Sequence, residues 1–246
     1  MLTLLRKVRQ SLVETGATRR YLFYAIGEIA LVVMGILIAL QINNWNEERK
    51  EQALQKEYLK GIKQDLEADI PFIEKRISRL VQRISTLHEI DSTYIPASQT
   101  EPYDVSLDSI DLHYVFRRGP SFRLTFGSYN ALISNASIGL ITNQELLQSI
   151  QELYNVRYPG SLSVYDDLKK REDHIGWKYA YELKHSDIQS FFIDNPRKKE
   201  ALADFNFYYK KLELYCSVLS NDQQFMLQII DDLSTEITRL NKKISN

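Results

Sequence analysis

The chain has 246 residues, 44% of them hydrophobic and 26% charged, which is the composition of a folded protein with a real core and excludes general disorder. Its net charge is only −1, so no basic face for nucleic-acid phosphates is expected and we predict no nucleic-acid partner. The single cysteine, Cys216, cannot form a disulfide within the chain, so burial must hold the fold together. Cys216 is expected to be a buried, inert thiol, and a disulfide between two chains is the alternative.

The N-terminal 45 residues have the layout of a membrane anchor. Residues 1–20 carry five basic residues against Glu14 alone, a net charge of +4. Residues 22–42 read LFYAIGEIALVVMGILIALQI, which is 21 residues with one formal charge. As a helix this stretch spans roughly 30 Å, the thickness of the hydrocarbon core of a bilayer. We therefore predict a cytoplasmic tail over 1–20 and a transmembrane helix over 21–45, with the lipid bilayer as a partner.

Aromatic residues flank the apolar stretch at both ends. Tyr21 and Tyr24 lie at one end and Trp45 at the other, where amphipathic rings favour the headgroup region. The tail before Tyr21 is the only strongly basic flank, because the residues after Trp45 mix both signs of charge. The positive-inside rule then predicts a cytoplasmic N-terminus and a body on the other side of the membrane.

Two other interpretations of the apolar stretch stay open. A cleaved signal peptide also has a basic start and an apolar core, but that core is usually shorter, and residues 38–41 offer no small-x-small cleavage site. A buried core helix of a soluble protein is the second alternative, although 21 nearly uninterrupted apolar residues exceed what an amphipathic helix needs. An uncleaved anchor is the favoured interpretation.

One face of the predicted anchor combines small residues with a carboxylate. Gly27, Gly35 and Ala39 share a face with Leu31, since they recur every four residues, and small residues allow two helices to approach closely. Glu28 follows Gly27 and is costly inside a membrane unless it is neutralised or paired. We predict helix association through Gly27, Glu28, Gly35 and Ala39, with a second copy or with a partner protein. The alternative is that Glu28 snorkels to the interface and does nothing more.

The anchor and its exit resemble a known family. Residues 24–50, with the Gly-Glu pair and the sequence Asn-Asn-Trp-Asn-Glu at 43–47, resemble the N-terminal signature of DUF6090, a family of Bacteroidota single-pass membrane proteins of unknown function. Residues 128–155 carry a second, looser likeness. The resemblance implies an anchor in the bacterial inner membrane and a periplasmic helical body. It implies no activity, substrate or catalytic residue.

Two long amphipathic helices are predicted at the ends of the body, over 46–92 and 206–246. Apolar residues in the first follow steps of four and three, and Pro71 interrupts them, which predicts a kink or a fresh helix start near residue 70. These residues are Leu54, Tyr58, Ile62, Leu66, Ile70, Ile73, Ile77, Leu80, Ile84 and Leu87. The second has the same pattern from Leu212 to Ile244. An antiparallel hairpin between the two helices buries both stripes, and a parallel coiled coil between copies is the competing arrangement.

The middle of the chain, 93–205, is predicted to be a helical distal cap. Only residues 122–126 alternate like a short strand, and Thr142 with Glu145 predicts a capping box that opens a helix ending near Val156. The remaining predictions are a loop over 91–105 and helices over 107–118, 128–134, 162–184 and onward from 195. The fold class is therefore all-α: a transmembrane helix followed by a helical bundle with long, antiparallel, coiled-coil-like N- and C-terminal helices.

Candidate sites in the cap are few. Arg117, Arg118 and Arg123 surround a Gly-Pro turn and could hold a carboxylate or phosphate, since a guanidinium binds such groups through two parallel hydrogen bonds. They could equally pair with acids of the cap. No catalytic motif, phosphate loop or metal-ligand spacing occurs, so we predict no catalytic residue, no metal and no cofactor.

The predicted function is therefore that of a non-enzymatic, membrane-anchored periplasmic module. It acts by interaction, as a homo-oligomer or as a subunit of an envelope complex with another envelope protein. A sensory input domain that signals through a partner is the alternative, and an unrecognised enzyme is a third.

Overall fold

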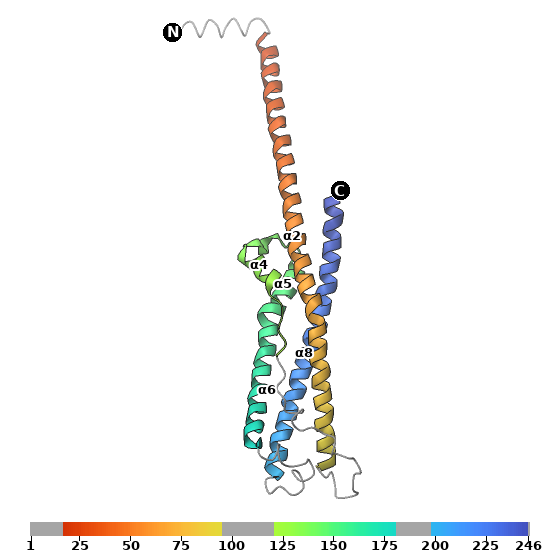
Figure 1. The fold of residues 1–246 in the computed structure, drawn as a ribbon. Helices are drawn as coiled ribbons and strands as arrows, with labels where there is room; N and C mark the ends of the chain where they lie inside the picture. Colours follow the sequence, from red (N-terminus) through yellow and green to blue (C-terminus); the bar gives the residue numbers. More distant parts are fainter. Residues whose placement is uncertain (1–16, 95–120, 181–197, 246) are drawn as a thin grey trace, which may run out of the picture. The chain divides into compact units, whose positions relative to one another are not determined.

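The structure is a computed structural model that describes residues 17–94, 121–180 and 198–245. Over these residues it is helical and contains no strand, in agreement with the predicted all-α class (Figure 1). The elements are α2 (Ala17–Tyr94), α4 (Gly127–Ser134), the 3-10 helix η2 (Ser137–Leu140), α5 (Gln144–Glu152), the π-helical turn η3 (Leu153–Arg157), α6 (Tyr158–Lys178) and α8 (Lys198–Ser245). The chain forms two compact units, Met1–Leu54 and Gln55–Asn246.

The described part of the first unit consists of the N-terminal stretch of α2. This helix is long and apolar enough to cross a membrane, with a mean hydropathy of 2.3 in its most apolar window. None of that window is buried, and Leu31 is 73% exposed. The core helix of a soluble protein would have buried these side chains. The apolar stretch therefore has no packing partner among the described residues.

Helix α2 continues through Pro71 as one element. Of the two alternatives predicted near residue 70, the fresh helix start is therefore wrong, and the kink stays a prediction. A proline removes the hydrogen bond to the carbonyl four residues earlier, here that of Glu67. Both Pro71 and Glu67 are exposed, on the side of the helix opposite buried Ile73. Water can satisfy the freed carbonyl there, which lets the helix tolerate the proline.

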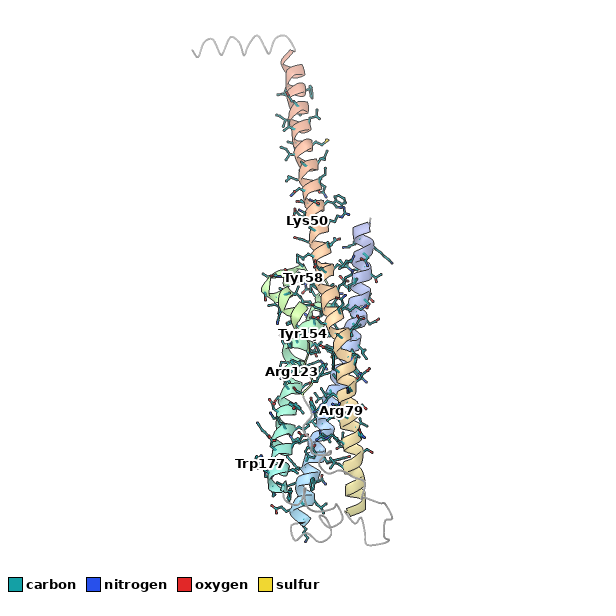
Figure 2. All side chains as sticks on the ribbon, viewed as in Figure 1. Lys50, Tyr58, Arg79, Arg123, Tyr154 and Trp177 are labelled. Carbon is teal, nitrogen blue, oxygen red and sulfur yellow. The ribbon has the colours of Figure 1, made fainter. Side chains whose placement is uncertain are left out.

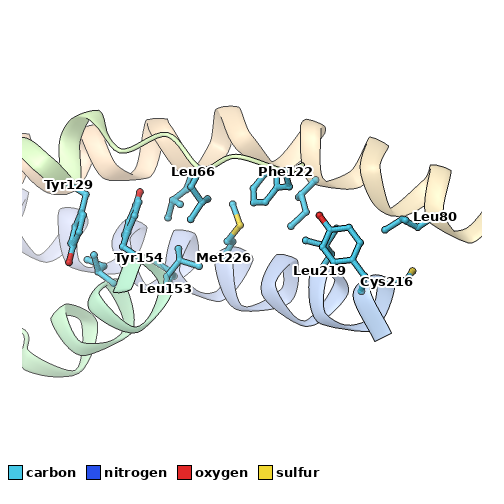
Figure 3. Packing of buried hydrophobic residues seen from close by; sticks show 14 of the residues in the cluster. Leu66, Leu80, Phe122, Tyr129, Leu153, Tyr154, Cys216, Leu219 and Met226 are labelled. Atoms are coloured by element: carbon cyan, nitrogen blue, oxygen red, sulfur yellow. The ribbon is translucent and has the colours of Figure 1, made fainter. Parts of the chain in front are cut away.

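In the second unit, α2 and α8 pack against each other in antiparallel directions, as predicted. Glu74 accepts a hydrogen bond from Gln223 at 3.2 Å, whereas Arg83, further along α2, contacts Tyr208, earlier on α8. Predicted stripe residues of α2 from Ile62 onward are buried or half-buried, while Leu54 is exposed. In Figure 3, Leu66 of α2 and Met226 of α8 lie together in the core beside Leu153 of η3.

Both helices bury side chains at a strict seven-residue spacing. The buried residues that follow this spacing are Leu59, Leu66, Ile73, Leu80 and Leu87 on α2, and Phe205, Leu212, Leu219, Met226, Leu233 and Leu240 on α8. Cys216 is also buried, as expected, and burial raises the pKa of its thiol, which keeps the sulfur in its unreactive protonated form.

Helices α5 and α6 form one run joined by η3, which corrects two predicted boundaries. The predicted stop near Val156 is wrong, and α6 begins at Tyr158 rather than at residue 162. Pro159 cannot donate a backbone hydrogen bond, which would end an ordinary α-helix. The π turn before it changes the pattern: the Tyr158 N–H donates to the Leu153 carbonyl five residues earlier. This wider turn lets the helix pass the proline.

The predicted capping box at Thr142 is also wrong, because Asn143 is the N-cap of α5. Its side-chain oxygen accepts a hydrogen bond from the Leu146 N–H at 3.1 Å. The Thr142 hydroxyl instead accepts a hydrogen bond from Arg239 of α8 at 3.4 Å. Asparagine is as good an N-cap as threonine or better, so Asn143 can cap the helix as well as the neighbouring Thr142 could.

Other predicted boundaries can be compared only in part. The short helix at 128–134 is confirmed as α4. The helix predicted onward from 195 and the one predicted over 206–246 form a single element, α8, described from Lys198. Helix α2 extends to Tyr94, four residues into the predicted loop. Residues 122–126 have no regular secondary structure, although Phe122 and Leu124 alternate with exposed Arg123 as the pattern predicted. The predicted helix over 107–118 lies outside the described residues.

Gly61 is where α4 approaches α2 most tightly. A Cβ atom at Gly61 would lie 2.6 Å from the Ser128 Oγ and 3.1 Å from its Cβ. We expect Gly61→Ala to lower the free energy of unfolding by about 1–2 kcal/mol, because crowding of the start of α4 outweighs the helix propensity gained. Gly160→Ala is the matched control, since nothing lies within 4 Å of that site, and it should raise stability by about 0.5–1 kcal/mol. Chemical denaturation of both variants tests this, and equal effects would contradict the contact.

Candidate functional site

Buried charged residues recur on α2 at the seven-residue spacing. Ile62, Asp69, Arg76 and Arg83 follow one another at that interval, and all four are buried. Charged side chains are almost never buried without a partner, because removing a charge from water is costly. Each of the three charges therefore requires its own compensation.

Asp69 is compensated by the segment before α4. Its two carboxylate oxygens accept hydrogen bonds from the backbone N–H and the hydroxyl of Thr125, at 2.7 and 2.8 Å. One turn earlier on α2, Asp65 accepts from the Ser128 N–H at 2.9 Å. Burial raises the pKa of Asp69, while the hydrogen bonds from Thr125 act in the opposite direction. These acids hold the segment 121–126 along α2.

Arg83 is compensated by two residues from other helices. It donates hydrogen bonds to Glu172 of α6, at 2.5 Å, and to the hydroxyl of Tyr208 of α8. Tyr208 in turn donates to the same Glu172 oxygen at 3.1 Å. Burial raises the pKa of Tyr208 well above its usual value, so the hydroxyl keeps its proton for this bond. This buried group ties α2, α6 and α8 together.

Arg76 is the exception. It is 6% exposed, and its guanidinium carbon lies 5.8 Å from the ring centroids of both Tyr165 and Tyr215. Two of its nitrogens, Nε and Nη2, are buried without a hydrogen-bond partner. Burial raises the pKa of Tyr215, while Arg76 and the Phe122 backbone N–H act in the opposite direction. The rings stabilise the charge of Arg76 but leave two donors unused.

A cavity of about 460 Å³ lies against Arg76. It is lined by Asp69, Phe72, Lys75, Arg76, Arg79, Ser121, Phe122, Arg123 and Thr125, which come from α2 and from the segment before α4. Figure 2 shows Arg79 and Arg123 on these two parts of the chain. Four of the lining residues are cations and only Asp69 is an acid, so the lining is positively charged. Such a cavity is large enough for a small organic anion.

The predicted arginine cluster is only partly described. Arg123 is exposed at the cavity, whereas Arg117 and Arg118 lie outside the described residues. The structure brings Arg123 together instead with Lys75, Arg76 and Arg79 of α2, and none of these partners was predicted. Arg76 lies two seven-residue steps after Ile62. Had the repeat been extended to polar residues, it would have predicted that Arg76 is buried.

Predicted residues of the anchor lie on the apolar stretch of α2. Nothing lies within 4 Å of a Cβ built at Gly27 or Gly35, and Glu28 and Ala39 are exposed. Trp45 is exposed too, with the Arg49 guanidinium 5.9 Å from its ring centroid. Tyr21 and Tyr24 belong to α2, but their side chains lie outside the described ones. Across the described part of the chain, no group of His, Cys, Asp and Glu could hold a metal ion.

Fold and cavity together define a class: an all-helical protein with one helix that is long and apolar enough to cross a membrane and a cationic cavity in its helical body. The chain belongs to the family of unknown function DUF6090, whose model matches residues 28–173. That match includes every lining residue of the cavity and ends within α6, before α8 begins. No curated protein and no solved structure matches the chain.

Proposed function

We propose that this protein is a membrane-anchored interaction module whose apolar stretch is a retained anchor. Its basic tail lies in the cytoplasm and its helical body in the periplasm of a bacterial cell. The module acts by binding rather than by catalysis, as a homo-oligomer or as a subunit of an envelope complex.

A single observation carries this proposal: the most apolar stretch of the chain is wholly exposed while the rest of α2 forms a core. Exposing such a stretch to water costs about 25 cal/mol for each Å² of apolar surface, so it needs an apolar surrounding. A bilayer supplies that surrounding at the matching thickness. The +4 charge of residues 1–20 supports the orientation.

Association is proposed to occur with a second copy, through the face that carries Gly27, Gly35 and Ala39. Among the described residues, a Cβ built at either glycine meets no atom within 4 Å beyond its own stretch of helix backbone, so another helix can approach there. Glu28 lies beside this face and has no neighbour of opposite charge on the apolar stretch. A polar side chain on a partner helix can form a hydrogen bond with the Glu28 carboxyl group.

We expect Gly35→Leu and Glu28→Leu to shift the full-length protein in neutral detergent from oligomer to monomer. The first adds bulk where helices must touch, and the second removes the polar contact. Val33→Leu is the matched control, because it enlarges a residue on the opposite face of the same helix. Mass photometry reads the masses directly. A monomeric wild type, or equal masses for all variants, would contradict association through this face.

A sensory role is the second candidate, and one observation favours it. Five lining residues of the cationic cavity, between Asp69 and Arg79, belong to the same helix as the apolar stretch. A ligand in the cavity would therefore contact the helix that enters the membrane. Signalling by this route requires a partner that responds to α2.

A further inference from the structure

The three buried charged residues of α2 follow one another at a seven-residue spacing, but the partners that compensate their charges differ. Asp69 is bonded to Thr125 and Arg83 to Glu172 and Tyr208, whereas two donors of Arg76 are unused. An unsatisfied buried charge costs far more than a satisfied one. Arg76 is therefore the position on this helix where the chain itself leaves a buried positive charge incompletely satisfied.

The two unused donors are on the same edge of the guanidinium. Nη2 is the terminal nitrogen on the Nε–H side, so one N–H from each nitrogen points in nearly the same direction. Two parallel N–H groups match the two oxygens of a carboxylate or of a phosphate group, and such paired bonds are among the strongest in proteins. A neutral acceptor or a single water would satisfy this edge less completely.

The cavity beside Arg76 favours an anion further. Lys75, Arg79 and Arg123 are exposed at its rim, and no ion pair to a described residue is formed by any of them. Asp69 can offset only one of the four positive charges of the lining, and its two oxygens already accept hydrogen bonds from Thr125. Phe72, 68% exposed, adds an apolar surface to the same rim.

We propose that this cavity binds a small organic phosphate or carboxylate. Binding requires a small rotation of the Arg76 side chain, which turns its buried Nε and Nη2 edge toward the charged oxygens. The rim cations neutralise the remaining charge, and the organic part of the ligand lies against Phe72. This inference does not depend on the membrane anchor, since every residue it uses belongs to the second unit. Its failure would leave the proposed anchoring untouched.

Binding is tested with the full-length protein in neutral detergent, using inorganic phosphate and phenyl phosphate as probes. Both are titrated to about 20 mM at ionic strength held constant with chloride, which is enough to saturate a site with a Kd near 1 mM. Calorimetry and thermal unfolding should both report saturable binding. Phenyl phosphate is expected to bind several-fold more tightly, because its ring covers Phe72. The absence of saturable binding by both probes would overturn the proposal.

Two double variants distinguish binding at this cavity from a general attraction between the ligand and the positive charges of the protein. Arg79→Gln with Arg123→Gln removes two rim charges and should weaken phenyl phosphate binding by about 10-fold or more. Lys60→Gln with Lys210→Gln removes the same charge from exposed positions that do not line the cavity and should weaken binding by less than about 3-fold. Equal losses in the two pairs would refute a defined site.

Variants of Arg76 test its role as the central ligand. Arg76→Lys keeps the charge but loses the paired donors, so binding should weaken by about 10-fold or more. Arg76→Met should abolish the rise in melting temperature with phenyl phosphate, while the unliganded protein keeps its stability because an incompletely satisfied buried charge has been removed. If Arg76→Met fails to fold, Arg76→Lys decides the matter. Undiminished affinity in Arg76→Lys would contradict the paired contact.

Discussion

Replacing Glu172 with leucine is expected to destabilise the protein by about 3–5 kcal/mol, the largest effect of any single substitution considered for the body. Glu172 and Arg83 are both buried, with side chains 3% and 5% exposed. The substitution removes the carboxylate that pairs with the buried Arg83 charge and keeps the contact with the neutral Tyr208 hydroxyl. For a protein of this size the melting temperature should fall by about 10 °C or more.

The double variant Arg83→Met with Glu172→Leu should recover most of that loss. Removing both charges together eliminates the uncompensated one, and apolar side chains of similar volume can fill the space. We expect it to lie within about 1 kcal/mol of the wild type in chemical denaturation. The matched control is Glu67→Gln, which breaks the largely exposed pair with Lys63 and should cost about 0.5 kcal/mol or less. Additive losses in the double variant would show that the pair does not act as a unit.

A fragment of residues 47–246 is expected to be soluble without detergent and to unfold at nearly the temperature of the full chain. The second unit begins at Gln55, and the first fully buried apolar residue of α2 is Leu59, so this cut removes no core side chain. Full-length protein should instead require detergent, because the apolar stretch stays exposed without it. Circular dichroism and sedimentation measure the two properties.

A second fragment, residues 67–246, is the matched comparison for the first. It lacks Leu59, Ile62 and Leu66, which are fully buried in the core. Burial of each contributes about 2–3 kcal/mol, and their sum approaches the whole stability of a typical domain. This fragment should fail to fold cooperatively. If it melts like the longer one, the first half of the α2 stripe is not part of the core.

The long stripes were predictable because they repeat many times. Each of the two long helices carries at least six apolar residues at helical spacing, so chance agreement is small and the spacing of four and three favours a paired helix. Their positions at opposite ends of the body favoured an antiparallel hairpin, but the spacing alone left a parallel coiled coil between copies open. Contacts from Glu74 to Gln223 and from Arg83 to Tyr208 confirm the antiparallel direction.

The ends of individual helices were predicted less well, because several neighbouring residues can each begin or end a helix. Thr142 and Asn143 are both competent caps; Asn143 caps α5, and Thr142 accepts a hydrogen bond from Arg239 of α8. Pro159 and Gly160 predict a stop, but a π turn passes the proline. Tertiary packing decides both cases, and neither is visible in a short window of sequence.

The cavity could not be predicted from apolar periodicity alone. Arg76 and Arg83 occupy core positions of the repeat, yet polar residues are normally assigned to the surface. The partners of Arg83 lie far away in sequence, on α6 and α8, and the partner of Asp69 lies in the segment 121–126. Arg123 was predicted as an anion ligand, but its neighbours on α2 became apparent only from the fold.

The most direct test of the membrane-anchored arrangement is the location of the C-terminus in a living cell. Alkaline phosphatase, which is active only outside the cytoplasm, is fused after Asn246 and expressed in a Gram-negative host. We predict phosphatase activity that stays with carbonate-washed membranes, on a protein whose mass includes residues 1–42. Inactive fusion protein would contradict the predicted orientation, and soluble activity on a protein lacking the apolar stretch would identify a cleaved signal peptide instead of an anchor.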